Sequence, residues 1–330
     1  MPGQSILPRW RGFNLLDMFT IHSDGNFHED DFRWMAEWGF DFARIPACYT
    51  LWSEGEDVYR LHEPMLEKMD RVVRLGQQYG IHICLNFHRA PGYSVNRERQ
   101  EPFNLWKDAE ALAAFCFHWE TFARRYRGIP STRLSFNLVN EPVRPTQDGL
   151  TRADHERVMR TAVAAIRAID PERLIILDGV SWGNETLPEL VDLGVGQSCR
   201  AYLPMGVSHY KASWAGGEHY PQPSWPGQMP DGKYWDRQAL QAHYQDWANL
   251  AQQGVGVHCG EGGAFHFTPH PVTLAWLRDV LEVLKALNIG LALWNFRGAF
   301  GILDSGRKDV AYEDWRGHQL DRQMLELLRV

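Results

Sequence analysis

Two glutamates stand in contexts that suit acid–base or nucleophilic chemistry. Glu141 follows an apolar run and lies in the tripeptide Asn-Glu-Pro, and Glu261 follows Val-His-Cys and is flanked by glycines. Each carboxylate therefore stands where an apolar segment turns into a loop, and the glycines beside Glu261 let a substrate approach closely. An arbitrary glutamate is usually solvated or salt-bridged at the surface, so the two contexts matter more than the residue type.

A pair of carboxyl groups across a cleft is what glycoside hydrolysis requires. One protonates the departing oxygen, and the other attacks the anomeric carbon or activates water. Carboxyl groups about 5–5.5 Å apart imply retention through a covalent intermediate, and about 6.5–9.5 Å implies inversion. The acid must stay protonated near neutral pH while its partner stays charged, so the site must push the two pKa values apart.

The elements that position these glutamates form a regular alternation. Short apolar runs alternate with amphipathic segments from end to end, which is typical of βα units around a parallel sheet. Because the runs number about eight, the sequence predicts an α/β fold, a (β/α)8 TIM barrel that spans residues 1–330 as a single domain. The predicted strands are Gly12–Leu15, Phe42–Ile45, Ile81–Phe87, Leu134–Val139, Leu174–Leu177, Gly206–His209, Val255–Cys259 and Gly290–Leu293.

Helices are predicted between these strands. Apolar residues at helical spacing run from Asp108, a candidate N-cap, to Tyr126. Pro64 suits the first turn of a helix that ends at Tyr79, with Gly80 after it. Two further apolar stripes cover residues 158–169 and 277–287.

Polar, ionisable or aromatic residues lie in the last residues of nearly every predicted strand or directly after it. In barrel enzymes the active site forms at the C-terminal ends of the strands. A purely structural distribution would scatter such residues over both ends, so their coincidence predicts one site. The residues are Asn14, Arg44, His88, Asn140, Glu141, His209, Tyr210, Glu261 and Trp294.

With these motifs in order, the chain resembles glycoside hydrolase family 5, the cellulase-like retaining barrels, over nearly its whole length. The resemblance implies that Glu141 is the acid/base and Glu261 the nucleophile. The motifs that carry it are Arg11-Gly12-Phe13-Asn14, Arg44-Ile45-Pro46, Asn86-Phe87-His88, Asn140-Glu141-Pro142, Gly260-Glu261-Gly262 and Trp294-Asn295-Phe296.

The resemblance also implies roles around the glutamates. Asn140 matches the amide that binds the sugar 2-hydroxyl, and Arg44 matches the guanidinium that binds the nucleophile and keeps it ionised. His88 matches a sugar-binding histidine, and Trp294 matches the aromatic floor of the subsite that holds the reacting sugar. Tyr210 matches the phenol that orients the nucleophile.

One departure from the family pattern concerns the sixth strand. The family has a His and a Tyr separated by one residue there, whereas His209 and Tyr210 are adjacent. Neighbouring strand residues point to opposite faces, so both reach the site only where the strand ends or bulges. Either Ser208 replaces the usual histidine, or a local kink re-aims His209. Trp182, after the fifth strand, is interpreted as lining a subsite or as a packing residue.

Composition narrows the partners. The net charge of −7 offers no basic stripe for nucleic acid, and no apolar stretch reaches the length of a membrane span. Fourteen tryptophans, several in loop-like segments, suit a carbohydrate groove because indole faces stack on sugar rings. We expect a carbohydrate substrate, no cofactor and a monomer. The chain is expected to be cytoplasmic as it stands, or secreted if a leader has been removed.

The function predicted from these observations is retaining hydrolysis of β-linked glucans or gluco-oligosaccharides, in the manner of an endoglucanase. The same scaffold also fits a β-mannanase, or an exo-acting β-1,3-glucanase or β-glucosidase. A metal-dependent barrel hydrolase is a further alternative, but the sequence lacks the HxH and HExxH spacings of metal ligands. A non-catalytic sugar-binding barrel would be expected to lose one of the carboxylates, and both are present.

Overall fold

The computed structural model describes residues 7–55, 57–96 and 98–330 and contains a closed parallel barrel. Each barrel strand pairs in parallel with its neighbours, and the β1–β13 and β2–β5 pairings complete the ring. The predicted (β/α)8 barrel is therefore confirmed. Its strands within the described residues are β1 (Arg11–Asn14), β2 (Phe42–Cys48), β5 (His82–Ala90), β7 (Leu134–Asn137), β8 (Leu174–Asp178), β9 (Gly196–Ala201), β12 (Val257–Gly262) and β13 (Gly290–Leu293).

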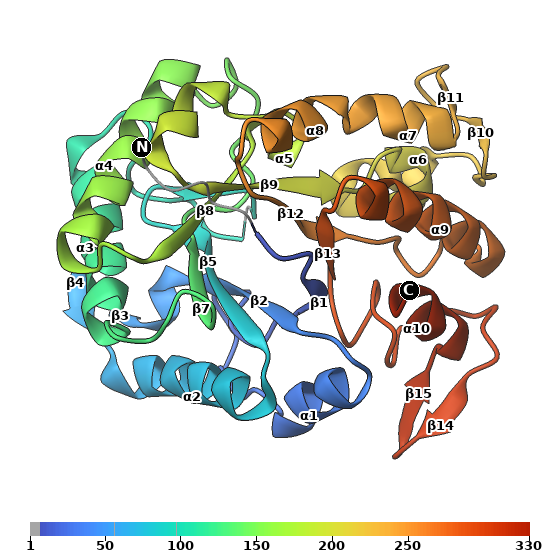
Figure 1. Cartoon of the computed structure of the whole chain (residues 1–330), viewed down its shortest axis with the longest axis horizontal. Coiled ribbons are helices and arrows are strands. Elements are labelled where there is room, and N and C mark those ends of the chain that lie inside the picture. The colour runs from blue at the N-terminus through green and yellow to red at the C-terminus, as the bar shows by residue number, and fades with distance from the viewer. Residues whose placement is uncertain (1–6, 56, 97) are drawn as a thin grey trace.

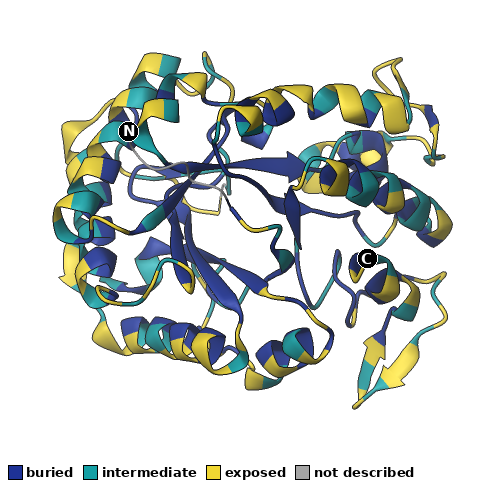
Figure 2. Ribbon diagram, viewed as in Figure 1, coloured by how far each residue is buried: buried dark blue, intermediate teal, exposed yellow. Residues whose placement is uncertain are grey.

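Helices surround this barrel (Figure 1). Their inward faces are buried and their outward faces exposed, while the barrel strands are almost entirely buried (Figure 2). The longer helices are α1 (Glu29–Glu37), α2 (Glu63–Tyr79), α3 (Ala109–Arg125), α4 (Arg152–Ile169), α7 (Arg237–His243), α8 (Gln245–Gln252), α9 (His270–Ala286) and α10 (Arg322–Leu328). Two single turns, α5 (Val180–Gly183) and α6 (Met205–Ser208), come shortly after β8 and β9.

Short strands decorate the barrel. The pairs β3 (Ser53–Glu54) with β4 (Asp57–Leu61), β10 (Gly227–Gln228) with β11 (Tyr234–Trp235), and β14 (Glu313–Trp315) with β15 (His318–Leu320) are antiparallel, and β6 (Tyr93–Ser94) folds back on β5. Among the described helices, none combines the length and the apolar character needed to cross a lipid bilayer.

The predicted helices are confirmed, and their ends have the expected causes. Pro64 lies in the first turn of α2, and Gly80 ends the helix in the left-handed conformation with φ 71°. Asp108 is the N-cap residue of α3. The α4 helix begins with a capping box, in which the Thr151 hydroxyl accepts from the main chain of Asp154 while the Asp154 carboxylate accepts from Thr151.

The sixth strand was predicted in the wrong place. Residues 196–201 form β9, whereas the predicted Gly206–His209 begins as the α6 turn, with Pro204 at its N-cap. The sequence of β9, Gly-Gln-Ser-Cys-Arg-Ala, contains no large apolar residue. Its polar residues are nevertheless buried, because Ser198 and Arg200 face the barrel interior and Gln197 on the other face bonds the main chain of Leu187. Apolar periodicity therefore could not detect it.

The barrel interior has its own small core, separate from the layer between sheet and helices. Phe42 and Arg44 lie two residues apart on β2, so both point to the same face of the strand. Phe42 packs inside the barrel near the strand starts, and Arg44 lies nearer the strand ends. The interior core comprises Leu7, Trp10, Phe42, Cys84, Ile176 and Ala292.

Candidate active site

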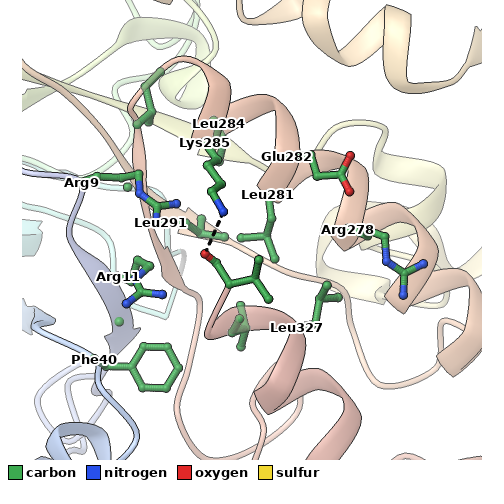
Figure 3. Close-up of a pocket in the computed structure, with 15 residues that line it drawn as sticks. Arg9, Arg11, Phe40, Arg278, Leu281, Glu282, Leu284, Lys285, Leu291 and Leu327 are labelled. Carbon is green, nitrogen blue, oxygen red and sulfur yellow. Dashed lines mark hydrogen bonds between the residues drawn. The ribbon is translucent and has the colours of Figure 1, made fainter.

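A cavity of about 290 Å³ lies at the end of the barrel where the strands begin (Figure 3). It is lined by residues at the starts of β1 and β13 and on α9 and α10. Glu282 is the carboxylate that lines it, and Arg237 pairs with this side chain. Among the described residues, the side chains that line this cavity therefore lack the pair of carboxyl groups on which the predicted chemistry depends, and both predicted glutamates lie at the opposite end of the barrel.

Glu261 lies in β12, at a bulge where the register with β9 shifts. Its side chain is buried, with 4% exposed. Arg44 donates from Nη1 to Oε1 at 2.6 Å, and the Tyr202 hydroxyl donates to Oε2 at 3.1 Å. A bulge re-aims a strand side chain, and here it presents the Glu261 carboxylate to fixed donors on two other strands.

Arg44 is itself held by three asparagine side chains at neighbouring strand ends. Its Nη1 donates to Asn14 at 3.1 Å, its Nε to Asn137 at 2.9 Å and its Nη2 to Asn140 at 2.8 Å. The buried guanidinium thus has acceptors around its whole edge, which offsets the cost of removing it from water. Its position is fixed by side chains of β1 and β7 and of the loop that follows β7.

Glu141 follows β7 in a left-handed backbone conformation, with φ 46°. Its main-chain N–H donates to Asp178 at 3.0 Å, and its main-chain carbonyl accepts from the Tyr93 hydroxyl at 2.6 Å. Such a conformation is costly for a residue with a side chain, and these two bonds stabilise it. The carboxyl Oε1 accepts from Arg200 Nε at 2.8 Å.

The environment of Glu141 favours the protonated acid. Burial and the nearby Glu261 raise the pKa of Glu141 to about 7, against the opposing effect of Arg200. By contrast, Asp178 stays ionised: burial acts to raise its pKa, but Arg200 and Arg44 outweigh it and lower the pKa. Glu141, the residue that the sequence assigned as the acid, can therefore carry a proton near neutral pH, whereas Asp178 stays charged.

Asn140, His88 and Trp294 lie together beside the glutamates. The Asn140 amide nitrogen lies 3.5 Å from Nε2 of His88, whose ring centre is 5.6 Å from that of Trp294. Burial lowers the pKa of His88 well below its ordinary value, so the ring is neutral. Phe19 adds an edge-on contact to both rings, at 4.5 and 5.3 Å. The structure thus gathers the predicted residues around an aromatic wall.

The predicted Tyr210 contact with the nucleophile is wrong, because the phenol that bonds Glu261 is Tyr202. Tyr210 lies past the α6 turn, with Lys211 over its ring at 5.2 Å. Burial, followed by Glu261, raises the pKa of Tyr202 well above its ordinary value, so the hydroxyl keeps the proton it donates.

Neither Ser208 nor His209 lies on the sixth strand. Ser208 ends α6, and its hydroxyl lies 2.8 Å from Nδ1 of His209. The His209 ring packs edge-on against Tyr202, with 5.1 Å between ring centres, and burial lowers its pKa to about 4. His209 therefore supports the tyrosine as a neutral ring, without a hydrogen bond to either glutamate among the described residues.

Trp182 lies in the α5 turn with φ 57°, where its main-chain N–H donates to the carbonyl of Pro142 at 2.9 Å. Its ring is partly buried against the main core. Trp182 thus braces the loop that follows Glu141, and its part in sugar binding stays a prediction.

Three site residues were missed or misplaced by sequence reasoning: Arg200, Tyr202 and Asp178. Arg200-Ala201-Tyr202 has the one-residue spacing that the family shows between its His and Tyr. That spacing was the available signal, but Arg in place of His concealed it. Asp178 ends β8 and accepts bonds from Arg200 and from the main chain of Glu141.

Comparisons with known proteins agree with this geometry. The profile of "Cellulase (glycosyl hydrolase family 5)" matches residues 3–299. Endoglucanase C of Acetivibrio thermocellus is 26% identical over 88% of this chain and 90% of that protein. Cellodextrinase A of Ruminococcus flavefaciens is 24% identical over 78% of this chain and 74% of that protein.

Solved structures show the same fold. A crystal structure described as a glycoside hydrolase is 42% identical, with a TM-score of 0.92, and the match covers 97% of this chain and 98% of that one. Cel5A of Thermotoga maritima in complex with mannotriose is 21% identical, with a TM-score of 0.77 over 97% of each chain. The protein belongs to glycosyl hydrolase family 5 and is a glycoside hydrolase that acts on O-glycosyl bonds.

Proposed function

We propose that this enzyme hydrolyses β-1,4-linked glucans or their oligosaccharides with retention, using Glu261 as nucleophile and Glu141 as acid/base. The observation that carries the proposal is that both carboxylates bond to one guanidinium group, that of Arg200, at 2.8 and 3.3 Å. Two carboxyl groups within the span of one side chain suit the short separation of retaining enzymes, about 5–5.5 Å, better than the wider separation that inversion needs.

In the first step a carboxylate oxygen of Glu261 attacks the anomeric carbon. The bond from that carbon to the leaving oxygen breaks, and the proton of Glu141 passes to the leaving oxygen. Because Oε1 of Glu141 is anchored by Arg200, Oε2 is the oxygen free to carry that proton. The raised pKa of Glu141 supplies the protonated form near neutral pH.

In the second step Glu141 is an ionised base. It takes a proton from water while the water oxygen attacks the anomeric carbon, and the ester bond to Glu261 breaks. Once Glu261 is esterified its negative charge is gone, so the charge that had raised the pKa of Glu141 disappears and the carboxyl group releases its proton more easily.

The substrate assignment rests on the names of the relatives and on the charge of the chain. The curated relatives include endoglucanases and a cellodextrinase, and the net charge of −7 favours a neutral sugar over an anionic one. The Cel5A structures are described in complex with mannotriose and with cellobiose, so β-1,4-mannan belongs on the same test panel.

The test is to assay Glu261→Ala and Glu141→Ala on β-linked gluco- and manno-oligosaccharides and to follow product anomers by NMR. We expect wild-type retention and a loss of at least about 10⁴-fold in kcat for Glu261→Ala. Added azide should react in the space left by Glu261→Ala and give the α-glycosyl azide from an activated β-glucoside. Glu282→Ala, in the cavity at the other end of the barrel, serves as the control. Inverted products, or a Glu261→Ala enzyme with wild-type activity, would overturn the proposal.

A further inference from the structure

Arg200 lies at the centre of the site, although sequence reasoning assigned it no role. Its side chain is 1% exposed. Nε donates to Glu141, Nη1 donates to Ser198 and to the carbonyl of Cys199, each at 3.1 Å, and Nη2 donates to Asp178. Nη2 also lies 3.1 Å from Asn140 Oδ1 and 3.3 Å from Glu261 Oε1. Every nitrogen of the guanidinium is therefore bonded, and each of the site's carboxylates touches it.

The surrounding backbone leaves a shaped space for this side chain. A Cβ at Gly260 would lie 2.6 Å from Ser198 Oγ and 3.1 Å from Nη1 of Arg200. A Cβ at Gly183 would lie 2.7 Å from Cγ of Arg200. A glycine in β12 and a glycine in the α5 turn thus leave room for the arginine side chain, so the surrounding main chain is shaped to hold it.

The charges of the cluster balance only when Asp178 is included. Arg44 and Arg200 supply two positive charges, and ionised Glu261 and Asp178 supply two negative charges. With Glu141 protonated the buried site is neutral, and ionisation of Glu141 would leave one uncompensated charge. After Glu261 is esterified the balance reverses, and ionised Glu141 restores neutrality.

We propose that Arg200, with Asp178 as its counter-ion, is a positioning residue that holds Glu141 through Nε and stands where the family pattern has histidine. This inference rests on the acid/base role proposed above for Glu141. A histidine can lose its charge near neutral pH, whereas an arginine cannot, so this position needs a permanent carboxylate partner. Asp178 fills that need and also bonds the main-chain N–H of Glu141 at 3.0 Å.

The two members of the pair act on Glu141 in opposite directions. Arg200 lowers the pKa of Glu141 and Asp178 raises it, on top of the larger effects of burial and Glu261. Removal of the positive charge should therefore raise the pKa of Glu141 and move the alkaline limb of the pH profile of kcat/KM to higher pH. Removal of the negative charge should lower the pKa of Glu141 and move this limb to lower pH. A purely structural role would not produce shifts of opposite sign.

The experiment compares Arg200→Gln, Arg200→Lys and Asp178→Asn by pH profiles of kcat and kcat/KM. We expect Arg200→Gln to raise the alkaline limb by about 1 pH unit or more, and Asp178→Asn to lower it by a similar amount. Arg200→Lys keeps the charge but loses the Nε bond, so its limb should stay near the wild-type value while kcat falls about 10-fold or more with KM little changed.

Arg173→Gln is the matched control, because Arg173 is also a buried arginine paired with an aspartate, at the opposite end of β8. It should lower thermal stability and leave the limb unchanged. The inference would be overturned if the alkaline limbs of Arg200→Gln and Asp178→Asn stayed at the wild-type pH or shifted in the same direction. If Arg200→Gln does not fold, the near-isosteric Asp178→Asn decides alone: a downward shift supports the pair, and an unchanged limb refutes it. Loss of retention in wild type would instead refute the proposed function.

Discussion

The two ends of strand β8 each carry a buried arginine–aspartate pair, and the pairs do different work. At the start of the strand, Arg173 bonds Asp170 and the main-chain carbonyls of Tyr126, Ile129 and Leu134. At its end, Asp178 bonds Arg200, whose other contacts include both proposed catalytic carboxylates. The first pair ties loops together, and the second sets the charge of a reactive site.

The remaining groups inside the barrel follow the same division. Near the strand starts the rings of Trp10 and His82 stack, with 3.9 Å between their centres, and His258 packs on Phe42 at 4.4 Å. Burial lowers the pKa of His82 to about 4 and that of His258 to about 3, so both are neutral rings. The barrel is therefore filled by uncharged packing at one end and by compensated charges at the other. Among the described residues inside the barrel, the ionised groups therefore lie at the end that carries the two proposed catalytic glutamates.

The largest effect is expected from Phe42→Ala, which tests whether the packed end of the barrel can be weakened without loss of activity at the other end. Phe42 is fully buried in the interior core, and truncation of such a ring typically costs about 3–5 kcal/mol of stability. Denaturant unfolding measures this loss. Because Arg44 is anchored separately by three asparagines, the folded fraction should keep most of the wild-type kcat. A variant with wild-type stability in denaturant but a much lower kcat would show that the two ends of the barrel are not independent.

The next effect separates the two tyrosines after the sixth strand. Tyr202→Phe removes the hydroxyl bond to Glu261, and a bond to a charged group is worth about 1.5–3 kcal/mol, so kcat should fall about 10- to 100-fold. Tyr210→Phe is the matched control and should leave kcat nearly unchanged. Steady-state kinetics on an aryl β-glucoside decides. A larger loss for Tyr210→Phe would reverse the assignment made from the geometry.

The smallest effect is in the pH dependence of stability. His82 has a lowered pKa, so its contribution is present above the unfolded value of 6.5 and is lost as pH falls towards about 4. Glu141 has a raised pKa, so its contribution is present below the unfolded value of 4.5 and is lost as pH rises through about 7.

Between pH 4.5 and 6.5 the two groups therefore change the free energy of unfolding with pH in opposite directions. His82→Gln should make stability rise less steeply with pH in this window, and Glu141→Gln should make it rise more steeply, each by up to about 1.4 kcal/mol per pH unit. Urea unfolding at a series of pH values measures the slopes. Changes of the same sign in both variants would contradict the division between the ends.

Much of the fold followed from sequence patterns. Seven of the predicted strands overlap observed barrel strands, because their buried residues are apolar and their neighbours are capped amphipathic helices. The site residues Glu141, Glu261, Arg44 and Asn140 were found because each lies in the last residues of a predicted strand or shortly after it. The sixth strand was not predicted, because its inward side chains, Ser198 and Arg200, line a polar site and the strand has no apolar run.

The sequence by itself determined the barrel, the two glutamates and the family, since these depend on local periodicity and on short motifs. Only the tertiary structure decided that Tyr202 rather than Tyr210 reaches Glu261, and that Arg200 and Asp178 complete the charge balance around Glu141. These residues come from different strands, and their interaction depends on closure of the barrel and on burial. The spacing of residues along one strand predicts neither barrel closure nor burial. The partner of a buried charge is therefore known only from the tertiary structure.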